Sequence, residues 1–145
     1  MLITVNPNAN LGPVLSPDNQ GYPTTAGILK NLYTKNYSAL ANRPPEHYIN
    51  VTDDAKLHIV ALAHPKVEFE RIFAIKEPFN FQVLIEALRE VYPEKKWDDF
   101  PEDQGEDLSV VKPIQRAEEL LKEAYGQGFV DRLTTVRQNT EKIDQ

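Results

Sequence analysis

The sequence predicts a single α/β domain, and the clearest sign is a strand that runs directly into a capped helix. Residues 48–51 alternate as a strand does, and Thr52-Asp53 follows as a helix N-cap before the apolar segment 54–63. Residues 2–5 form a short run of the branched side chains that sheets favour. A strand followed at once by a helix is the repeating step of α/β folds, and 145 residues suffice for one such domain.

The remainder of the N-terminal part is predicted to be largely irregular. Prolines and glycines interrupt residues 6–23 repeatedly, which favours a loop. Thr24 or Thr25 can then cap a short helix that continues to about Tyr33. The polar segment 36–47 carries two adjacent prolines and is predicted to be a connector.

Beyond the second strand, the sequence predicts one further strand, a candidate short strand and four helices. The helix over 54–63 is expected to be largely buried, because its apolar residues point in most directions: Ala55, Leu57, Ile59, Val60, Ala61 and Leu62. A strand is expected over 68–76, and Asn80 caps a helix with one apolar face that Pro93 ends. After a charged loop over 94–107, residues 108–111 are a candidate short strand. Two helices follow, one over 113–126 and one over 129–143 with these residues inward: Phe129, Leu133 and Val136.

Composition excludes several classes of function. The chain has no cysteine, which removes disulfides and thiolate chemistry, and its net charge of −6 gives no basic stripe for a nucleic acid. No apolar run approaches the roughly 20 residues of a membrane span. The N-terminus lacks the basic and apolar regions of a signal peptide, so a cytoplasmic protein is expected.

Tests for familiar catalytic motifs find no complete catalytic centre. Tyr92 and Lys96 have the spacing of a helical Tyr-Lys pair, but Pro93 ends the helix between them, so the match is interpreted as coincidental. The pair Gly126 and Gly128 follows a helix rather than a strand, which indicates a helix end and not a phosphate loop.

The three histidines and the adjacent acids are interpreted as structural. His58 and His64 are six residues apart and so lie on different sides of a helix, which argues against a metal site with His47. His58 is expected to be a core or hydrogen-bonded side chain. Asp53 and Asp54 are explained by capping of the helix that they begin.

The segment 6–13, NPNANLGP, is the unusual feature of the chain. It directly follows the first predicted strand, and loops at the carboxyl ends of sheet strands are where α/β proteins bind ligands. Proline and glycine there would fix the loop and let its backbone approach a ligand closely. A purely structural loop is the alternative, and the residues alone leave both interpretations open.

A family resemblance adds to these patterns. Extended short-chain dehydrogenase/reductases have, after their sixth sheet strand, a stretch that resembles TVNPNANLGPVL followed by GYPTTAG. The fungal aldehyde or ketone reductases, related to dihydroflavonol and cinnamoyl-CoA reductases, are the most similar. Their next strand and helix resemble YINVTDDAKLHIVAL, and their C-terminal region resembles ERIFAIKEPFNFQVLIEALREVYPEKK and the RAEELL helix. The resemblance follows nearly the whole chain in order.

The resemblance implies an α/β fold that is the C-terminal portion of a Rossmann-like NAD(P)-binding domain, with a mainly helical substrate-binding part and without the N-terminal βαβ units. It implies a nicotinamide pocket for NADP or NAD lined by these residues: Pro7, Asn8, Ala9 and Asn10. It implies a substrate side, for a small carbonyl compound, at these residues: Gly12, Pro13, Tyr22, Pro23, Thr24 and Gly27. Within one incomplete domain, residues 1–35 would hold the last strand, the cofactor and substrate loop and a helix. Residues 36–47 would connect them to the substrate-side region 48–145.

The chain also departs from the family. The Gly-rich βαβ unit and the catalytic Tyr-x-x-x-Lys pair, which precede this stretch in such reductases, are absent from the sequence. One hypothesis is therefore a truncated reductase that is inactive alone. The second is a non-catalytic binding module that pairs with an N-terminal partner chain or a full-length paralogue, which would cover the sheet edge left open by the missing strands.

Overall fold

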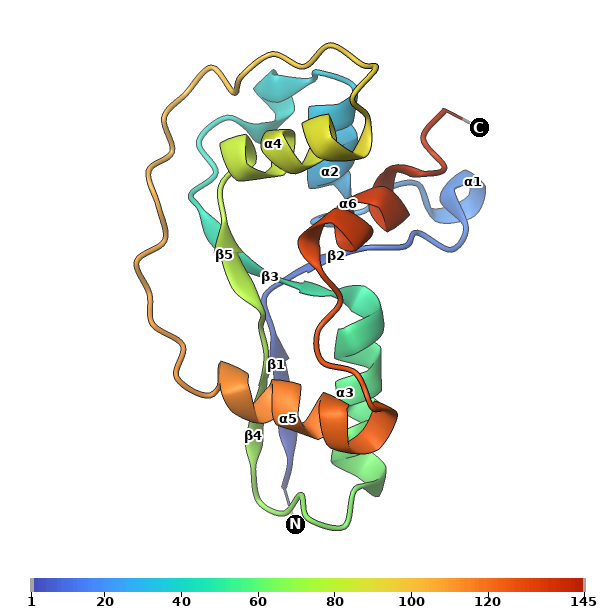
Figure 1. The fold of residues 1–145 in the computed structure, drawn as a ribbon, viewed down its shortest axis with the longest axis vertical. Helices are drawn as coiled ribbons and strands as arrows, with labels where there is room; N and C mark the ends of the chain where they lie inside the picture. Colours follow the sequence, from blue (N-terminus) through green and yellow to red (C-terminus); the bar gives the residue numbers. More distant parts are fainter. Residues whose placement is uncertain (1, 145) are drawn as a thin grey trace.

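The computed structural model describes residues 2–144 and shows an elongated α/β molecule (Figure 1). The α/β fold class predicted from the sequence is confirmed. The elements in chain order are β1 (Thr4–Pro7), β2 (Ala9–Leu11), α1 (Pro17–Gln20), α2 (Ala26–Tyr33), the 3₁₀ helix η1 (Tyr37–Leu40), β3 (Glu46–Asn50), α3 (Val51–Ala63), β4 (Arg71–Ala74), β5 (Glu77–Phe79), α4 (Phe81–Val91), α5 (Ile114–Tyr125) and α6 (Arg132–Thr140).

Two small sheets divide the molecule into a lower and an upper part. In the lower part β1 pairs with β4 in parallel, and α3 and α5 pack against this pair (Figure 1). In the upper part β3 pairs in parallel with β2 and antiparallel with β5. The chain passes from the lower sheet to the upper sheet twice, at Asn8 between β1 and β2 and at residues 75–76 between β4 and β5. The two crossings are neighbours because β1 and β4 are paired strands.

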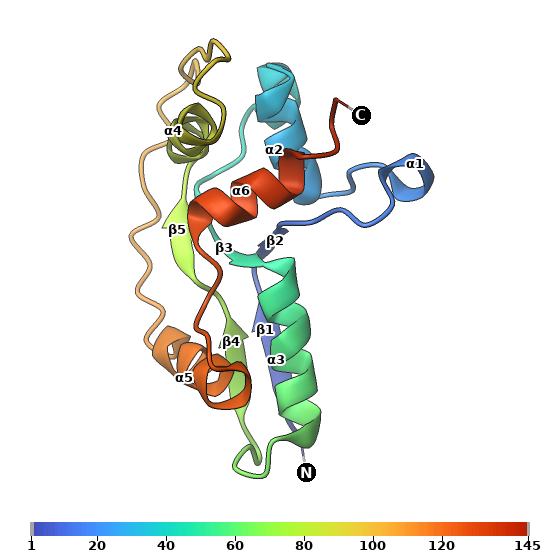
Figure 2. The ribbon, with the colours of Figure 1, turned by 45° about the vertical axis from the view of Figure 1, so that its right-hand side comes forward.

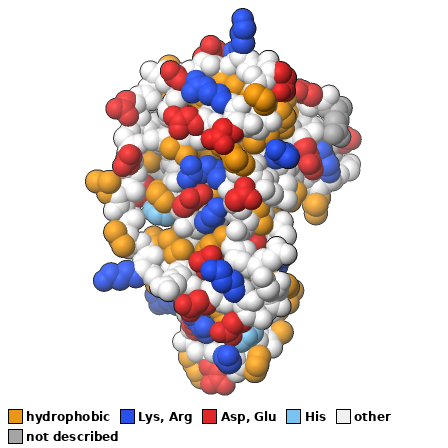
Figure 3. All heavy atoms as spheres, viewed as in Figure 1, with side chains coloured by type: hydrophobic (Ala, Val, Ile, Leu, Met, Phe, Trp, Pro, Cys, Tyr) orange, Lys and Arg blue, Asp and Glu red, His pale blue; other side chains and the backbone are white. Residues whose placement is uncertain are grey.

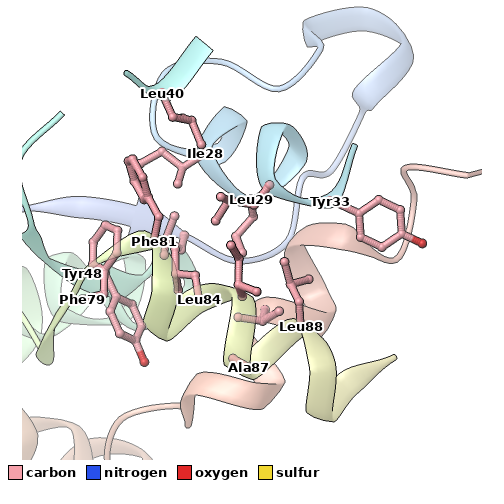
Figure 4. Packing of buried hydrophobic residues seen from close by; sticks show 14 of the residues in the cluster. Ile28, Leu29, Tyr33, Leu40, Tyr48, Phe79, Phe81, Leu84, Ala87 and Leu88 are labelled. Carbon is pink, nitrogen blue, oxygen red and sulfur yellow. The ribbon is translucent and has the colours of Figure 1, made fainter. Parts of the chain in front are cut away.

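Each part has its own apolar core. The lower core joins α3 and α5 to the parallel pair through residues such as Leu57, Ile72 and Leu120. The upper core lies between α2, α4 and the three-stranded sheet, where Leu29, Leu84 and their neighbours interlock (Figure 4). Helix α6 crosses at the junction, next to both α2 and α4 (Figure 2).

Helix α3 follows β3 without a loop, as the sequence predicts, but two details differ. The N-cap is Asn50, whose Oδ1 accepts a hydrogen bond from the Thr52 amide at 2.9 Å, rather than Thr52-Asp53. The expectation that the helix is largely buried is wrong, because Ile59 is 57% and Leu62 is 85% exposed. The buried residues of α3 form a single stripe, and no element among residues 2–144 covers Leu62 on the opposite side.

Three other expectations are corrected by the structure. The predicted loop 6–23 contains strand β2 and the short helix α1. Residues 9–11 form a strand because they pair with β3, which lies far along the chain. Residues 108–111 are not a strand, and Leu108 and Val110 stand exposed. The last helix is shorter than predicted and begins after its N-cap Asp131, while Leu133 is 37% exposed rather than inward.

Acidic and basic side chains are intermixed on the face shown in Figure 3. Among residues 2–144, no helix is both long and apolar enough to cross a membrane.

Candidate functional site

A cleft opens where strand β2 ends, between the segment that follows it and the start of α2. Its volume is about 190 Å³, and it is lined by Asn10, Leu11, Gly12, Pro13, Val14, Gln20, Pro23, Thr24, Thr25, Ala26 and Val51. Because β2 runs parallel to β3, the cleft lies at the carboxyl end of a parallel strand and beside the first residue of α3. This is the edge at which open α/β sheets bind their ligands.

The structure brings half of the residues predicted for the site into this cleft. Those that line it are Asn10, Gly12, Pro13, Pro23 and Thr24. Pro7 and Asn8 are exposed at the end of β1, and Ala9 is buried within the upper core. Tyr22 and Gly27 are not among the lining residues.

Tyr22 does not line the cleft and lies near the C-terminal segment. The ammonium group of Lys30 lies 5.0 Å from the centroid of the Tyr22 ring, and the phenol oxygen is buried without a hydrogen-bond partner among the described residues. Burial raises the pKa of Tyr22, and the charges of Asp144 and Glu141 raise it further. This hydroxyl therefore stays protonated near neutral pH.

Glycine at position 27 has a steric reason. A Cβ there would lie 2.9 Å from the carbonyl oxygen of Tyr22, closer than such atoms approach in real proteins. Gly27 thus lets the first turn of α2 pack against the segment that forms one wall of the cleft. Its contribution to the site is to the shape of that wall.

Hydrogen bonds from distant residues hold the walls of the cleft together. Thr25 Oγ1 donates to the carbonyl oxygen of Asn10 at 2.8 Å. Asn139 Oδ1 accepts from the Gly12 amide, and Asn139 Nδ2 donates to the carbonyl oxygen of Ala26, both at 3.1 Å. Thr25 occupies the N-cap position of α2, as predicted, but its hydroxyl serves this bond rather than a cap.

A second set of polar contacts joins α6 to the end of β3, beside the same cleft. Asn50 Nδ2 donates to Thr135 Oγ1 at 3.0 Å and to Gln138 Oε1 at 2.9 Å, while its Oδ1 caps α3. Sequence reasoning did not single out Asn50 or the polar residues of α6 for the site. The available signal was weak: Thr135 and Asn139 lie four positions apart and so share a helix face.

The electrostatics of the cleft centre on Asn10. Its Oδ1 is buried and has no hydrogen-bond partner among the described residues. Burial raises the pKa of Asp54, and a hydrogen bond from the Asn10 side chain, together with His58, partly counteracts that rise. The Asn10 side chain therefore lies close to Asp54.

Asp53 and the histidines have contacts that explain them. Asp53 is fully buried, and its Oδ2 accepts the Val130 amide at 2.7 Å, which ties α3 to the segment before α6. His58 is hydrogen-bonded, as expected, through the Asp54 carbonyl oxygen, but its side chain is exposed rather than in the core. Within residues 2–144, no three His, Cys, Asp or Glu side chains are grouped so that they could hold a metal ion.

The tyrosines near lysines do not form a proton-transfer pair. Tyr92 is hydrogen-bonded to Thr140 Oγ1 at 2.8 Å and packs edge-on against Tyr33. Tyr48 is fully buried and donates to Glu77 Oε1 at 2.6 Å. Burial and that hydrogen bond raise the pKa of Tyr48 far above neutrality, so it stays protonated.

No family model matches the chain, but individual relatives do. Aldehyde reductase 2 of Sporidiobolus salmonicolor is 34% identical over 110 residues, which cover 74% of this chain and 32% of that protein. The ketoreductase adrE of Penicillium roqueforti is 34% identical over 127 residues, which cover 87% of this chain and 37% of that protein. The chain matches the C-terminal part of extended short-chain dehydrogenase/reductases. It spans about a third of the length of these curated relatives.

Solved structures show the same fold. The crystal structure of Gre2 from Candida albicans aligns with a TM-score of 0.74 at 22% identity, over 99% of this chain and 44% of that one. Gre2 in complex with NADPH aligns with a TM-score of 0.72 at 23% identity, over 97% of this chain and 43% of that one. The structure described here is therefore part of a Rossmann-type reductase fold, as the family resemblance implied.

Proposed function

We propose that the cleft at the end of β2 is the substrate side of an NAD(P)-dependent aldehyde or ketone reductase. The observation that carries this proposal is the place of the cleft: residues predicted for the site, Asn10, Gly12 and Pro13 among them, line it at the carboxyl end of a parallel strand. The names of the relatives, an aldehyde reductase and a ketoreductase, support a small carbonyl compound as the substrate.

The residues of the cleft suit a nicotinamide group. A nicotinamide carboxamide carries a carbonyl acceptor, and Asn10, which lines the cleft and is partly exposed, has an amide group that can donate to it. In this proposal Asn10 and the backbone of residues 7–9 hold the nicotinamide end of NADPH or NADH, which supplies the hydride when bound. Residues 12–13 and 22–24 then shape the space beside it for the carbonyl substrate.

The chain's own residues act by orientation and by excluding water. Leu11 and Val14 are buried, so one side of the cleft is apolar, and Thr24 offers a hydroxyl on the other side. A carbonyl compound placed there has an apolar surface for its carbon chain and a hydroxyl donor for its oxygen. No cleft residue is arranged to transfer a proton, so the proposal assigns proton transfer to the part of such reductases that carries Tyr-x-x-x-Lys.

The direct test is an assay of the purified chain with NADPH and a panel of aldehydes and ketones. We expect no oxidation of NADPH above the protein-free background. Turnover that copurifies with the folded chain and disappears in Asn10→Ala would contradict this expectation, because it would place a complete catalytic centre within these residues.

A hybrid protein tests the substrate side itself. Residues 2–144 would replace the matching segment of Aldehyde reductase 2 from Sporidiobolus salmonicolor, whose remaining part supplies the Gly-rich unit. We expect NADPH-dependent carbonyl reduction with a substrate preference that differs from that of the parent. A hybrid that folds and binds NADPH but reduces no carbonyl compound would overturn the proposal.

The open side of the lower sheet favours a second role, that of a binding module. Among residues 2–144, strand β1 pairs only with β4, so one edge of this strand has no partner. Leu2 is 70% exposed and Phe69 is 75% exposed, and both line one shallow hollow with Thr4, Glu70 and Arg71. We infer that this surface takes up the cofactor-binding βαβ part of a reductase chain, whose strand would extend the sheet beside β1.

Association with a separately produced cofactor-binding part of Aldehyde reductase 2 tests this role. We expect a one-to-one complex in size-exclusion chromatography with light scattering. Phe69→Lys should weaken the complex without changing the melting temperature, whereas the same change at exposed Leu108 should have no effect. A chain that stays monomeric and monodisperse in the presence of the partner would refute the role.

A further inference from the structure

One buried amide, that of Asn139, connects the two walls of the cleft. Asn139 lies on α6 and is only 1% exposed. Its oxygen accepts from the backbone amide of Gly12 in the wall that follows β2, and its nitrogen donates to the backbone carbonyl of Ala26 in the wall formed by α2. Both partners line the cleft, and neither is near Asn139 in the sequence.

The contact depends on the carboxamide group. It needs a donor and an acceptor about one amide apart, and the carboxamides of asparagine and glutamine carry both on one planar group. Gly12 has a φ of +123°, and a Cβ at this position would lie 3.0 Å from Nδ2 of Asn50. The turn at Gly12 is therefore confined on one side by Asn50 and held on the other by Asn139.

The same face of α6 and its continuation makes three contacts around the cleft, one to the end of β3 and two to the segment that follows β2. Thr135 accepts from Asn50, Asn139 bonds to Gly12, and Lys142 Nζ donates to the carbonyl oxygen of Leu15 at 3.2 Å. Positions 135, 139 and 142 are spaced by four and three residues, so they lie along one side of a helix. Of these three residues, Asn139 also donates a hydrogen bond to the opposite wall, at the Ala26 carbonyl oxygen.

We propose that Asn139 is a positioning residue, which sets the distance between the segment 10–14 and the start of α2 and thereby the width of the cleft. The role in substrate binding rests on the proposed function, whereas the role in positioning follows from the contacts alone. Thr25 bridges the same two walls through Asn10, but it belongs to one of them. Asn139 holds both walls from a third element.

Amide hydrogen exchange on the full chain tests the positioning role. In Asn139→Leu, which has a similar volume and no polar group, the Gly12 amide should exchange at least about tenfold faster than in the wild type, because it loses its hydrogen bond. Thr140→Val is the matched control, since Thr140 is equally buried on the same helix but bonds to Tyr92. Its Gly12 exchange should stay at the wild-type rate.

Two results would overturn the positioning role. One is an unchanged Gly12 exchange rate in Asn139→Leu, and the other is equal acceleration in Thr140→Val, which would indicate general loosening of α6. If the leucine variant does not fold, Asn139→Ser replaces it, because serine leaves room for water and retains an acceptor. Its Gly12 amide should exchange at a rate between those of the wild type and a solvent-exposed amide, and a wild-type rate would again refute the role.

The hybrid reductase described above tests the consequence for the substrate. There Asn139→Leu should raise KM for the carbonyl compound about tenfold and change kcat by less than about twofold, because a misplaced wall weakens binding more than chemistry. Equal losses in kcat and KM for Asn139→Leu and Thr140→Val would refute a specific effect on the cleft. An inactive wild-type hybrid would count against the proposed function, while the exchange experiment would still decide the role of Asn139.

Discussion

Helices α4 and α6 both pack against α2, but they do so with different chemistry. Helix α4 contributes an apolar face, with Leu84, Ile85 and Leu88 fully buried against α2 and the sheet (Figure 4). Helix α6 contributes buried polar residues, notably Thr135 and Asn139, and only Val136 is an apolar member of the upper core. Both helices are needed to enclose α2 (Figure 2).

The two helices therefore have different effects: α4 contributes mainly to stability, and α6 mainly to the shape of the cleft. Apolar burial is non-directional, so α4 stabilises the upper part without specifying the positions of single backbone atoms. Hydrogen bonds require particular distances and angles, so α6 fixes the loop from Asn10 to Val14 atom by atom. The cleft is thus built on an apolar core but owes its form to polar contacts. Four changes can break or sharpen this contrast.

The largest effect is expected for truncation in the α4 face. Leu84→Ala removes a fully buried side chain and should lower the free energy of unfolding by about 2–5 kcal/mol. Leu62→Ala on the exposed side of α3 is the control and should change it by less than about 0.5 kcal/mol. Urea denaturation measures both. A large loss at Leu62 would mean that the outer side of α3 is covered in solution.

A smaller loss of stability is expected from a side chain at the turn of the cleft. Gly12→Ala should cost about 1–3 kcal/mol, because the positive φ is unfavourable for alanine and the new Cβ meets Asn50. Gly21→Ala is the control, since Gly21 has a φ of +65° but no atom within 4 Å of its Cβ position. Thermal denaturation should rank Gly12→Ala as the more damaging change. The reverse order would show that the Asn50 contact yields easily.

An ion pair with Glu77 holds the start of α6 in place, which predicts that the free energy of unfolding depends on pH. Burial opposes the ionised form of Glu77, but the hydrogen bond from Tyr48 and the nearby cations outweigh it and lower the pKa of Glu77 below its ordinary 4.5. One of these cations is Arg132 on α6, whose guanidinium lies 3.1 Å from Glu77 Oε2. Because the folded pKa is the lower one, the stabilisation is present above about pH 4.5 and is lost as the pH falls through the folded pKa.

Glu77→Gln should therefore cost about 1–2 kcal/mol at pH 7, and the difference from the wild type should shrink below pH 4.5. Denaturation at a series of pH values measures this. Glu90→Gln, at an exposed position of α4, should show a smaller difference at every pH. A Glu77→Gln difference that stays constant into acid would contradict the assigned role of the charge.

The smallest effect is expected for the bond between Thr25 and Asn10. Thr25→Val keeps the shape of the side chain and should cost about 0.5–1.5 kcal/mol, because one neutral hydrogen bond is lost. Thr34→Val is the control, since the Thr34 hydroxyl is exposed and bonds only within the end of α2. Urea denaturation that gives equal losses for both would show that the bridge between the walls adds nothing beyond a surface hydrogen bond.

The sequence predicted those elements whose signal is local. The strand–helix step from β3 to α3, the helix that Asn80 caps and the α5 helix that ends at Gly126 in a left-handed conformation follow from caps and apolar periodicity. Strand β2 escaped prediction because three residues carry no periodicity and become a strand only through their pairing with β3. The exposure of Ile59 and Leu62 escaped it because spacing defines an apolar side but not whether a layer covers it.

The sequence by itself determined the α/β class, the relationship to reductases and the segment from Pro7 to Pro13 as the place to expect a site. Only the tertiary structure decided which of the expected residues line the cleft, left Tyr22 out of that lining and brought Asn139 between the two walls. The physical reason is range: caps and helical faces arise between residues a few positions apart, whereas Asn139 and Gly12 meet across 127 positions. A contact of that separation leaves no periodic trace in the chain.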